Sequence, residues 1–340
     1  MDVKFQPMLQ RNIRLEELLK EINNLLGPIQ KNINTGYSSP KYPIVFIVGA
    51  PRSGTTILLQ WLAKTGQFSY PTNILSRFYA SPYIGAKIQL LLTDPEYNFY
   101  NEIMDFNHDI SFESNLGKTH GALSPNEFWY FWRRFIPNTE PRYLNMEEIN
   151  SINGNAFARE LASIESVFNK PLALKGIIMQ YNISTLSSFF KKAFFLYIKR
   201  EPFYNMQSLL EARIKYYGNR DAWYSVKPRE YDKLKNMNCF EQVAGQVYYT
   251  NCSIENEISQ IEKNRSLAIN YEEFCSNPTG IYNYIVNKLA SQACEIDPTY
   301  TGPPQLNNTN HNRLSEEDTK LIIRGYERIT GKRLQENDFL

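Results

Sequence analysis

The chain has 340 residues, 42% of them hydrophobic and 21% charged, which is enough apolar material for one large or two modest domains. A net charge of +2 gives no strong field for nucleic acid, and no run reaches the roughly 18 apolar residues of a membrane span. The N-terminus lacks a signal-peptide core and the four cysteines lack metal or disulfide spacing. We therefore expect a protein of a reducing compartment, the cytoplasm.

The first predicted element is an amphipathic helix over residues 9–32, where leucine and isoleucine recur at helical spacing. A polar linker containing Gly36 and Pro40 follows. Residues 1–40 are thus expected to form an N-terminal helix and linker ahead of a domain over 41–340. Such a helix packs either on the domain or on a second subunit, so a homodimer is open.

The most informative segment is 43–56. A β-branched apolar run ends at Gly49 and a helical pattern begins near Thr55, which predicts a strand, a tight turn and a helix whose N-terminus attracts anions. Residues 49–56 fit the phosphate loop G-x-x-x-x-G-K-[ST], except that Thr55 replaces the lysine and Arg52 supplies the cation. The alternative is an ordinary strand–helix turn whose glycines only permit the turn.

A nucleoside-triphosphate loop needs that lysine and usually magnesium, so this loop favours one compact anion. The pattern G-x-P-[RK]-S-G-T-T after a buried strand resembles the phosphosulfate loop of sulfotransferases that use 3′-phosphoadenosine 5′-phosphosulfate (PAPS). The resemblance implies PAPS as the sulfuryl donor and no metal. It also implies donor binding by loop residues, namely Arg52, Ser53, Gly54, Thr55 and Thr56.

Residues 70–155 are rich in aromatic side chains and lack strand alternation, so we expect a helical insertion that covers the site. Sulfuryl transfer to an alcohol needs a general base. Ser124-Pro125-Asn126-Glu127 loosely resembles the P-x-E-like segment of bacterial and glycan-directed sulfotransferases that use glutamate. The candidate bases, in order of preference, are Glu127, His120 and Glu113, with Glu102 and His108 behind them.

The same segment also fits a helix start, with Ser124 as N-cap, Pro125 at the first position and Glu127 closing a capping box. Beyond it, an apolar stripe at helical spacing is more typical of core than of a binding surface. That stripe comprises Phe128, Phe131, Trp132 and Phe135. The residues off the stripe could stack on sugars or pair with an acidic glycan: Trp129, Tyr130, Arg133 and Arg134.

Residues 171–176 resemble the family's strand that ends in a lysine near the active site, which implies a role for Lys175. In the cytosolic branch this strand reads K-T-H, with histidine as the base. Here Gly176 and Ile177 follow the lysine, so the chain does not belong with that branch and the base is open. Arg52 and Lys175 are expected to stabilise charge on the departing phosphate.

A second strong match lies at the strand 193–199. Arg200 ends it and Ser208 follows eight residues on, similar to the family's R-[DNE]-P-x-x-x-x-x-S motif for the 3′-phosphate. The planar guanidinium suits two phosphate oxygens at once. A solvent-facing arginine and a helix-surface serine are the alternative.

Strands at 43–48, 172–175, 193–199 and 266–270 with helices between them predict an α/β fold: a three-layer, doubly wound parallel sheet with its ligand at the carboxyl ends of the strands. The segment 299–315 is a long polar loop, a kind that is often functional. The family resemblance implies that it closes over the nucleotide, with His311 and Arg313 as contacts. A final helix is expected from Ser315, with Asp318 completing S-x-x-D.

These features indicate a PAPS-dependent sulfotransferase that acts on a hydroxyl acceptor by metal-independent in-line transfer. The favoured acceptor is a carbohydrate. A P-loop kinase or NTPase is the alternative, although position 55 lacks its lysine and no acidic strand end is evident for magnesium. A second alternative is a non-catalytic protein that keeps the fold and binds a nucleotide or a glycan.

Overall fold

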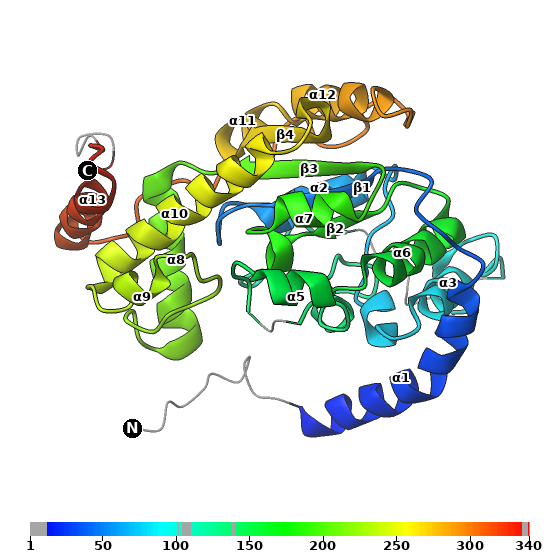
Figure 1. The fold of residues 1–340 in the computed structure, drawn as a ribbon. Coiled ribbons are helices and arrows are strands. Elements are labelled where there is room, and N and C mark those ends of the chain that lie inside the picture. The colour runs from blue at the N-terminus through cyan, green and yellow to red at the C-terminus, as the bar shows by residue number, and fades with distance from the viewer. Residues whose placement is uncertain (1–11, 101, 104–109, 138–139, 335–338, 340) are drawn as a thin grey trace.

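The structure is a computed structural model that describes residues 12–100, 102–103, 110–137, 140–334 and 339. At its centre the described residues form a parallel sheet of order β2-β1-β3-β4 (Figure 1). The strands are β1 (Ile44–Val48), β2 (Ala173–Lys175), β3 (Ala193–Lys199) and β4 (Ser266–Asn270). The expected strands are confirmed, with β1 and β2 each beginning one residue later than expected.

Side chains of the central strand β1 alternate between two apolar layers, because successive residues of a strand point to opposite faces. Ile44, Phe46 and Val48 belong to one buried cluster, and Val45 and Ile47 belong to the other. Helices cover both layers, which explains the continuous apolar run and confirms the three-layer doubly wound fold. The first layer is covered by α4 (Trp129–Trp132), α6 (Gly154–Phe168) and α7 (Ile183–Ser188), and the second by α2 (Thr55–Lys64), α11 (Tyr271–Ser276) and α12 (Pro278–Ala290).

A third apolar cluster lies beside the sheet, where three helices pack on one another (Figure 1). These are α8 (Pro202–Tyr217), α10 (Cys239–Ser259) and α13 (Glu316–Thr330), and the short α9 (Tyr231–Leu234) packs on α10. The predicted start of the last helix is confirmed, because the Ser315 side chain accepts a hydrogen bond from the backbone N–H of Asp318. Among the described residues, no helix is long and apolar enough to cross a bilayer.

Among its described residues, the segment 70–155 contains helices and isolated β-bridges but no strand. Its helices are η2 (Leu75–Phe78), α3 (Pro82–Thr93), α4, α5 (Met146–Ser151) and the start of α6. The 3₁₀ turns η4 (Ile177–Met179) and η5 (Lys263–Arg265) lie outside it. The aromatic stripe is core as expected, since Phe128, Phe131 and Trp132 are buried.

The helix start expected at Ser124 is wrong. Helix α4 begins at Trp129, and its N-cap is Phe128, in a left-handed conformation with φ of 59° and no side-chain cap. Ser124 instead donates its hydroxyl to the carbonyl of His120. Glu127 is therefore no capping residue, and its carboxylate is available for another role.

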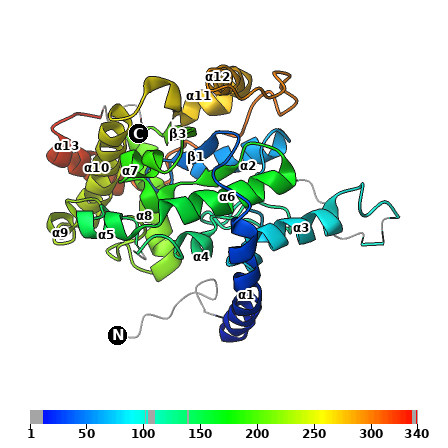
Figure 2. The same ribbon diagram turned by 45° about the vertical axis from the view of Figure 1, so that its right-hand side comes forward.

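The predicted N-terminal helix is α1 (Ile13–Asn34), and residues 9–11 lie outside the described residues. It packs on its own chain through polar side chains: Gln30 donates to the Ser163 hydroxyl at 3.2 Å, and Asn34 donates to a carboxylate oxygen of Glu160 at 3.1 Å. Its outer surface exposes leucines, and Figure 2 shows the helix extending from the body of the molecule. A homodimer stays a prediction.

Candidate active site

All four strands deliver a polar element to the carboxyl edge of the sheet, where ligands bind in open α/β folds. The loop 49–56 follows β1, Lys175 ends β2, Arg200 follows β3, and Tyr271 follows β4. These elements line one pocket of about 760 Å³. Its other walls come from the insertion (residues 112–117, His120 and Glu127), from Tyr224 and Ser225, and from the segment 306–309.

The loop 49–56 has the geometry of an anion cradle. A Cβ on Gly49 would lie 2.6 Å from the carbonyl oxygen of Ile198, and Gly54 has φ of 108°, so both positions require glycine. No side chain caps α2 at Gly54, which leaves its first N–H groups for a ligand. The Ser53 hydroxyl is buried and has no hydrogen-bond partner among the described residues. A buried, unpaired donor beside uncapped N–H groups suits a bound oxyanion.

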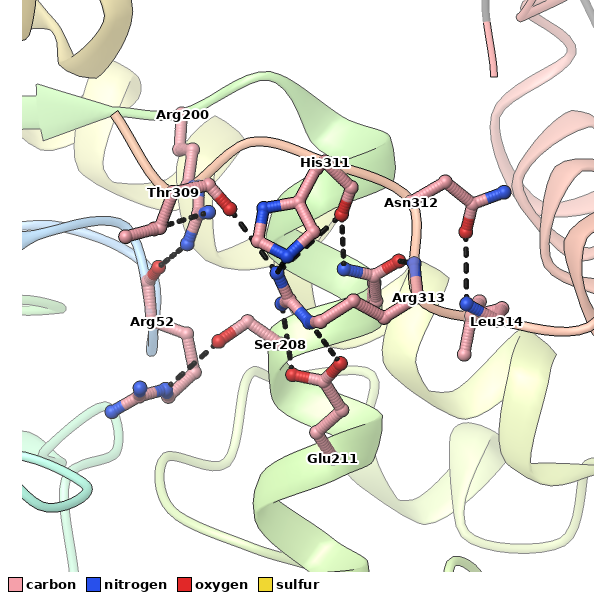
Figure 3. Close-up of polar contacts among 10 residues, drawn as sticks. Arg52, Arg200, Ser208, Glu211, Thr309, His311, Asn312, Arg313 and Leu314 are labelled. Atoms are coloured by element: carbon pink, nitrogen blue, oxygen red, sulfur yellow. Dashed lines mark hydrogen bonds and ion pairs between the residues drawn. The ribbon is translucent and has the colours of Figure 1, made fainter. Parts of the chain in front are cut away.

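The two phosphate motifs found in the sequence meet in space (Figure 3). Arg52 donates from Nε to the Ser208 hydroxyl at 3.2 Å, and Arg200 donates from Nη1 to the Arg52 carbonyl at 3.2 Å. Arg200 is 7% exposed and forms no ion pair with any described residue. Burial lowers the pKa of Arg200. A buried guanidinium that has no direct ion pair favours an anionic ligand, although the charge of nearby Glu272 acts on it.

Residues that the motifs do not reveal hold Arg200 in place. Asn310 accepts from Arg200 Nε at 2.7 Å. Thr309 accepts from Nη2 at 3.2 Å (Figure 3). Glu272 in turn accepts from the Asn310 side chain at 2.7 Å, and the Tyr271 ring lies 4.8 Å from the guanidinium carbon. The polar composition of 299–315 was the only sequence signal for Thr309 and Asn310.

The two residues of that segment expected at the nucleotide, His311 and Arg313, pair with each other and with α8. Arg313 forms a two-pronged ion pair with Glu211 of α8, at 2.7 and 2.9 Å (Figure 3). His311 lies beside Arg313, with its Nε2 3.3 Å from Nη1. Neither residue is among those that line the pocket, and their contact with the nucleotide stays a prediction.

Lys175 connects the anion cradle to the preferred base. Its Nζ donates to the Thr56 hydroxyl at 2.6 Å and pairs with Glu127 Oε1 at 2.8 Å. The lysine side chain is 3% exposed, whereas that of Glu127 keeps 28% exposure at the pocket wall. Trp129 donates its indole N–H to the other carboxylate oxygen.

Glu127 is held as a carboxylate. Burial alone raises its pKa, but the charge and hydrogen bond of Lys175, the Trp129 hydrogen bond and the charge of Arg52 outweigh burial. The pKa of Glu127 therefore lies below the usual carboxyl range. An ionised carboxylate that faces the pocket can accept a proton, which a general base must do.

The two other preferred bases also line the pocket, on its exposed side. Neither Glu113 nor His120 has a side-chain hydrogen bond or ion pair with a described residue. Gln60 fixes the backbone near Glu113 by donating to its carbonyl at 3.0 Å. Glu102 is exposed and does not line the pocket, and His108 lies outside the described residues.

Comparisons with solved structures agree with the fold. Sulfotransferase STF9 from Mycobacterium avium matches with 16% identity and a TM-score of 0.55, over 98% of this chain and 88% of that one. Sulfotransferase STF1 from Mycobacterium tuberculosis H37Rv matches with 10% identity and a TM-score of 0.53, over 97% and 88%. At these identities the two structures show a shared fold alone. A search of curated proteins gave no match.

The family comparison goes further. The family model described as "Sulfotransferase family" matches residues 43–292, which hold all four strands and both phosphate motifs. This match covers most of the chain. The protein therefore belongs to the sulfotransferase family, whose enzymes use PAPS as the sulfuryl donor.

Proposed function

We propose that the protein transfers a sulfuryl group from PAPS to a hydroxyl of a carbohydrate, with Glu127 as the general base. One observation carries the proposal: buried Lys175 bridges Thr56 of the anion cradle and the Glu127 carboxylate. The donor cradle and the candidate base thus share one pocket. A base beside an oxyanion site is the arrangement that acyl, phosphoryl and sulfuryl transfers require.

The described residues suit PAPS at both of its anionic ends. The unpaired Ser53 hydroxyl, the uncapped start of α2 and Arg52 would hold the 5′-phosphosulfate. Arg200 and Ser208 would hold the 3′-phosphate, because Arg200 is buried and forms no direct ion pair with a described residue. When bound, PAPS supplies an activated sulfuryl group whose departing phosphate gains negative charge. Arg52, Lys175 and the loop N–H groups are placed to stabilise that charge.

The acceptor side of the pocket supports a polyhydroxylated substrate. The insertion contributes Glu113, Ser114 and Asn115 to the wall, and Ser225 also lines the pocket. Phe112 and Tyr224 add aromatic surface of the kind on which sugar rings stack. In this proposal Glu127 takes the proton of the acceptor hydroxyl while Lys175 keeps the carboxylate ionised and in place.

Donor specificity tests the first half of the proposal. Adenosine 3′,5′-bisphosphate should bind without added metal and much more tightly than ATP, because the loop lacks the lysine that reaches the outer phosphates. Calorimetry with and without EDTA measures both affinities. Equal or tighter ATP binding, or a need for magnesium, would instead favour a P-loop kinase. Transfer of label from PAPS to carbohydrates, with simple alcohols and phenols as controls, tests the acceptor.

Arg52→Ala and Lys175→Ala should each lower turnover more than they weaken binding of adenosine 3′,5′-bisphosphate. The charge that these two cations face is greatest in the transition state, so their loss is expressed mainly in kcat. Label-transfer kinetics and calorimetry on the same preparations separate the two effects. Weaker nucleotide binding with unchanged kcat would mean that both residues contact the donor equally in the ground state and the transition state.

A further inference from the structure

A second cavity, of about 650 Å³, opens beside the active-site pocket. The two cavities share His120, which lines both of them. We call this second cavity the side groove. Its walls come from η2, α3 and the segment 119–122, so it lies entirely within the insertion. Because the two cavities adjoin at His120, the side groove is placed to receive a part of the acceptor that extends beyond the reacting hydroxyl.

The backbone around the side groove is held firmly. The N–H of Ile74 donates to the carbonyl of Ala122 at 3.1 Å, which joins the two walls. The carbonyl of Arg77 accepts from the buried Asn23 side chain of α1 at 2.8 Å. Helix α1 therefore supports the groove from behind, and the groove is a preformed feature of the fold.

Four polar side chains line the groove, and two of them, Asn73 and Thr119, already form hydrogen bonds with the backbone. Asn73 donates to the carbonyl of Gly121 at 2.8 Å, and Thr119 donates to the carbonyl of Pro125 at 2.7 Å. Arg77 and His120 have no side-chain hydrogen bond or ion pair with a described residue. The rest of the wall is largely apolar, contributed by Ile74, Phe78, Ile88 and Leu92.

We propose that the side groove binds the sugar unit next to the one that is sulfated, and that Arg77 pairs with a carboxylate on that unit. The inference rests on the proposed carbohydrate acceptor and narrows it to acidic glycans. The apolar wall fits the C–H face of a sugar ring, and the guanidinium fits a carboxylate with two parallel hydrogen bonds. His120 lies at the junction of the two subsites.

Two disaccharides that differ only at C6 of the distal unit test this assignment: cellobiose has a primary hydroxyl there and cellobiouronic acid a carboxylate. The wild-type enzyme should show a KM lower for cellobiouronic acid by roughly 3- to 10-fold, as for a partly exposed charged pair. Arg77→Gln should abolish that preference and leave the KM for cellobiose nearly unchanged. Arg77→Lys should retain part of the preference. Affinity for adenosine 3′,5′-bisphosphate, measured by calorimetry, should not change.

Two further variants complete the design. Arg159→Gln removes an exposed arginine of α6 that lines neither cavity, and it should keep the wild-type preference. Ala122→Trp should fill the groove and raise the KM for both disaccharides but not for glucose, with nucleotide affinity and melting temperature as checks on folding.

The outcomes separate this inference from the proposed function. Transfer to both disaccharides with the same KM ratio in wild type and Arg77→Gln would overturn the side-groove assignment alone. Neither transfer to nor binding of any of the three sugars by the nucleotide-bound enzyme would overturn the carbohydrate acceptor and the side groove together.

Discussion

Replacing Glu127 with glutamine should lower the rate of sulfuryl transfer by roughly 10²–10⁴-fold, the usual scale for loss of a general base. Glutamine keeps the shape of the side chain and an oxygen that can accept from Lys175, but it cannot take a proton at working pH. Folding and affinity for adenosine 3′,5′-bisphosphate should be nearly unchanged. Single-turnover label transfer from PAPS, with calorimetry on the same variant, measures both.

The pH dependence distinguishes Glu127 from His120. Because the pKa of Glu127 lies below the usual carboxyl range, a glutamate base stays ionised and kcat should remain level as the pH falls from 8 to about 5.5. A kcat that falls within this range would contradict the glutamate base and favour His120. If Glu127→Gln keeps nearly wild-type activity and His120→Ala is inactive, the general base is His120.

Arg200→Ala should weaken binding of adenosine 3′,5′-bisphosphate by about 2–4 kcal/mol, the cost of leaving a desolvated charge without its partner. Arg200 is buried, carries no ion pair among the described residues and is aligned by Asn310 and Thr309, so little reorganisation is needed to bind phosphate. Calorimetry measures the loss directly.

The preceding residue provides the control. Lys199 pairs with Glu255 on the surface, where the two side chains are 41% and 49% exposed, so Lys199→Ala should hardly affect nucleotide binding. An equal loss in both variants would mean that Arg200 acts only through general positive charge. An unchanged affinity in Arg200→Ala would remove the 3′-phosphate role from this residue.

Short patterns along the chain were enough to predict the sheet and both phosphate motifs. The loop 49–56 forms from consecutive residues, and its strand, glycines and helix start each leave a local signal. Arg200 and Ser208 likewise lie at the end of one strand and on the helix that follows it. The resemblance to sulfotransferases rested on these two motifs, and the family match agrees with it.

The surroundings of the candidate base were decided by tertiary structure. Ser124-Pro125-Asn126-Glu127 satisfies the local rules for a capped helix. The helix nevertheless begins only at Trp129, because the backbone at Phe128 is left-handed. Glu127 is instead fixed by Lys175, which arrives on a different strand. A sequence pattern reports only on residues that are close along the chain. The partner of a buried charge is the oppositely charged group that tertiary packing places beside it.

The same reason applies at the edges of the site. Arg313 pairs with Glu211, an acidic side chain one turn beyond Ser208, and no pattern within the segment 299–315 indicates that partner. Arg77 had no local signal at all, since its groove exists only because η2, α3 and the segment 119–122 pack together. The sequence by itself determined the strands, the anion cradle and the family resemblance. Packing between distant segments decided which charges are paired, and hence which are left for ligands.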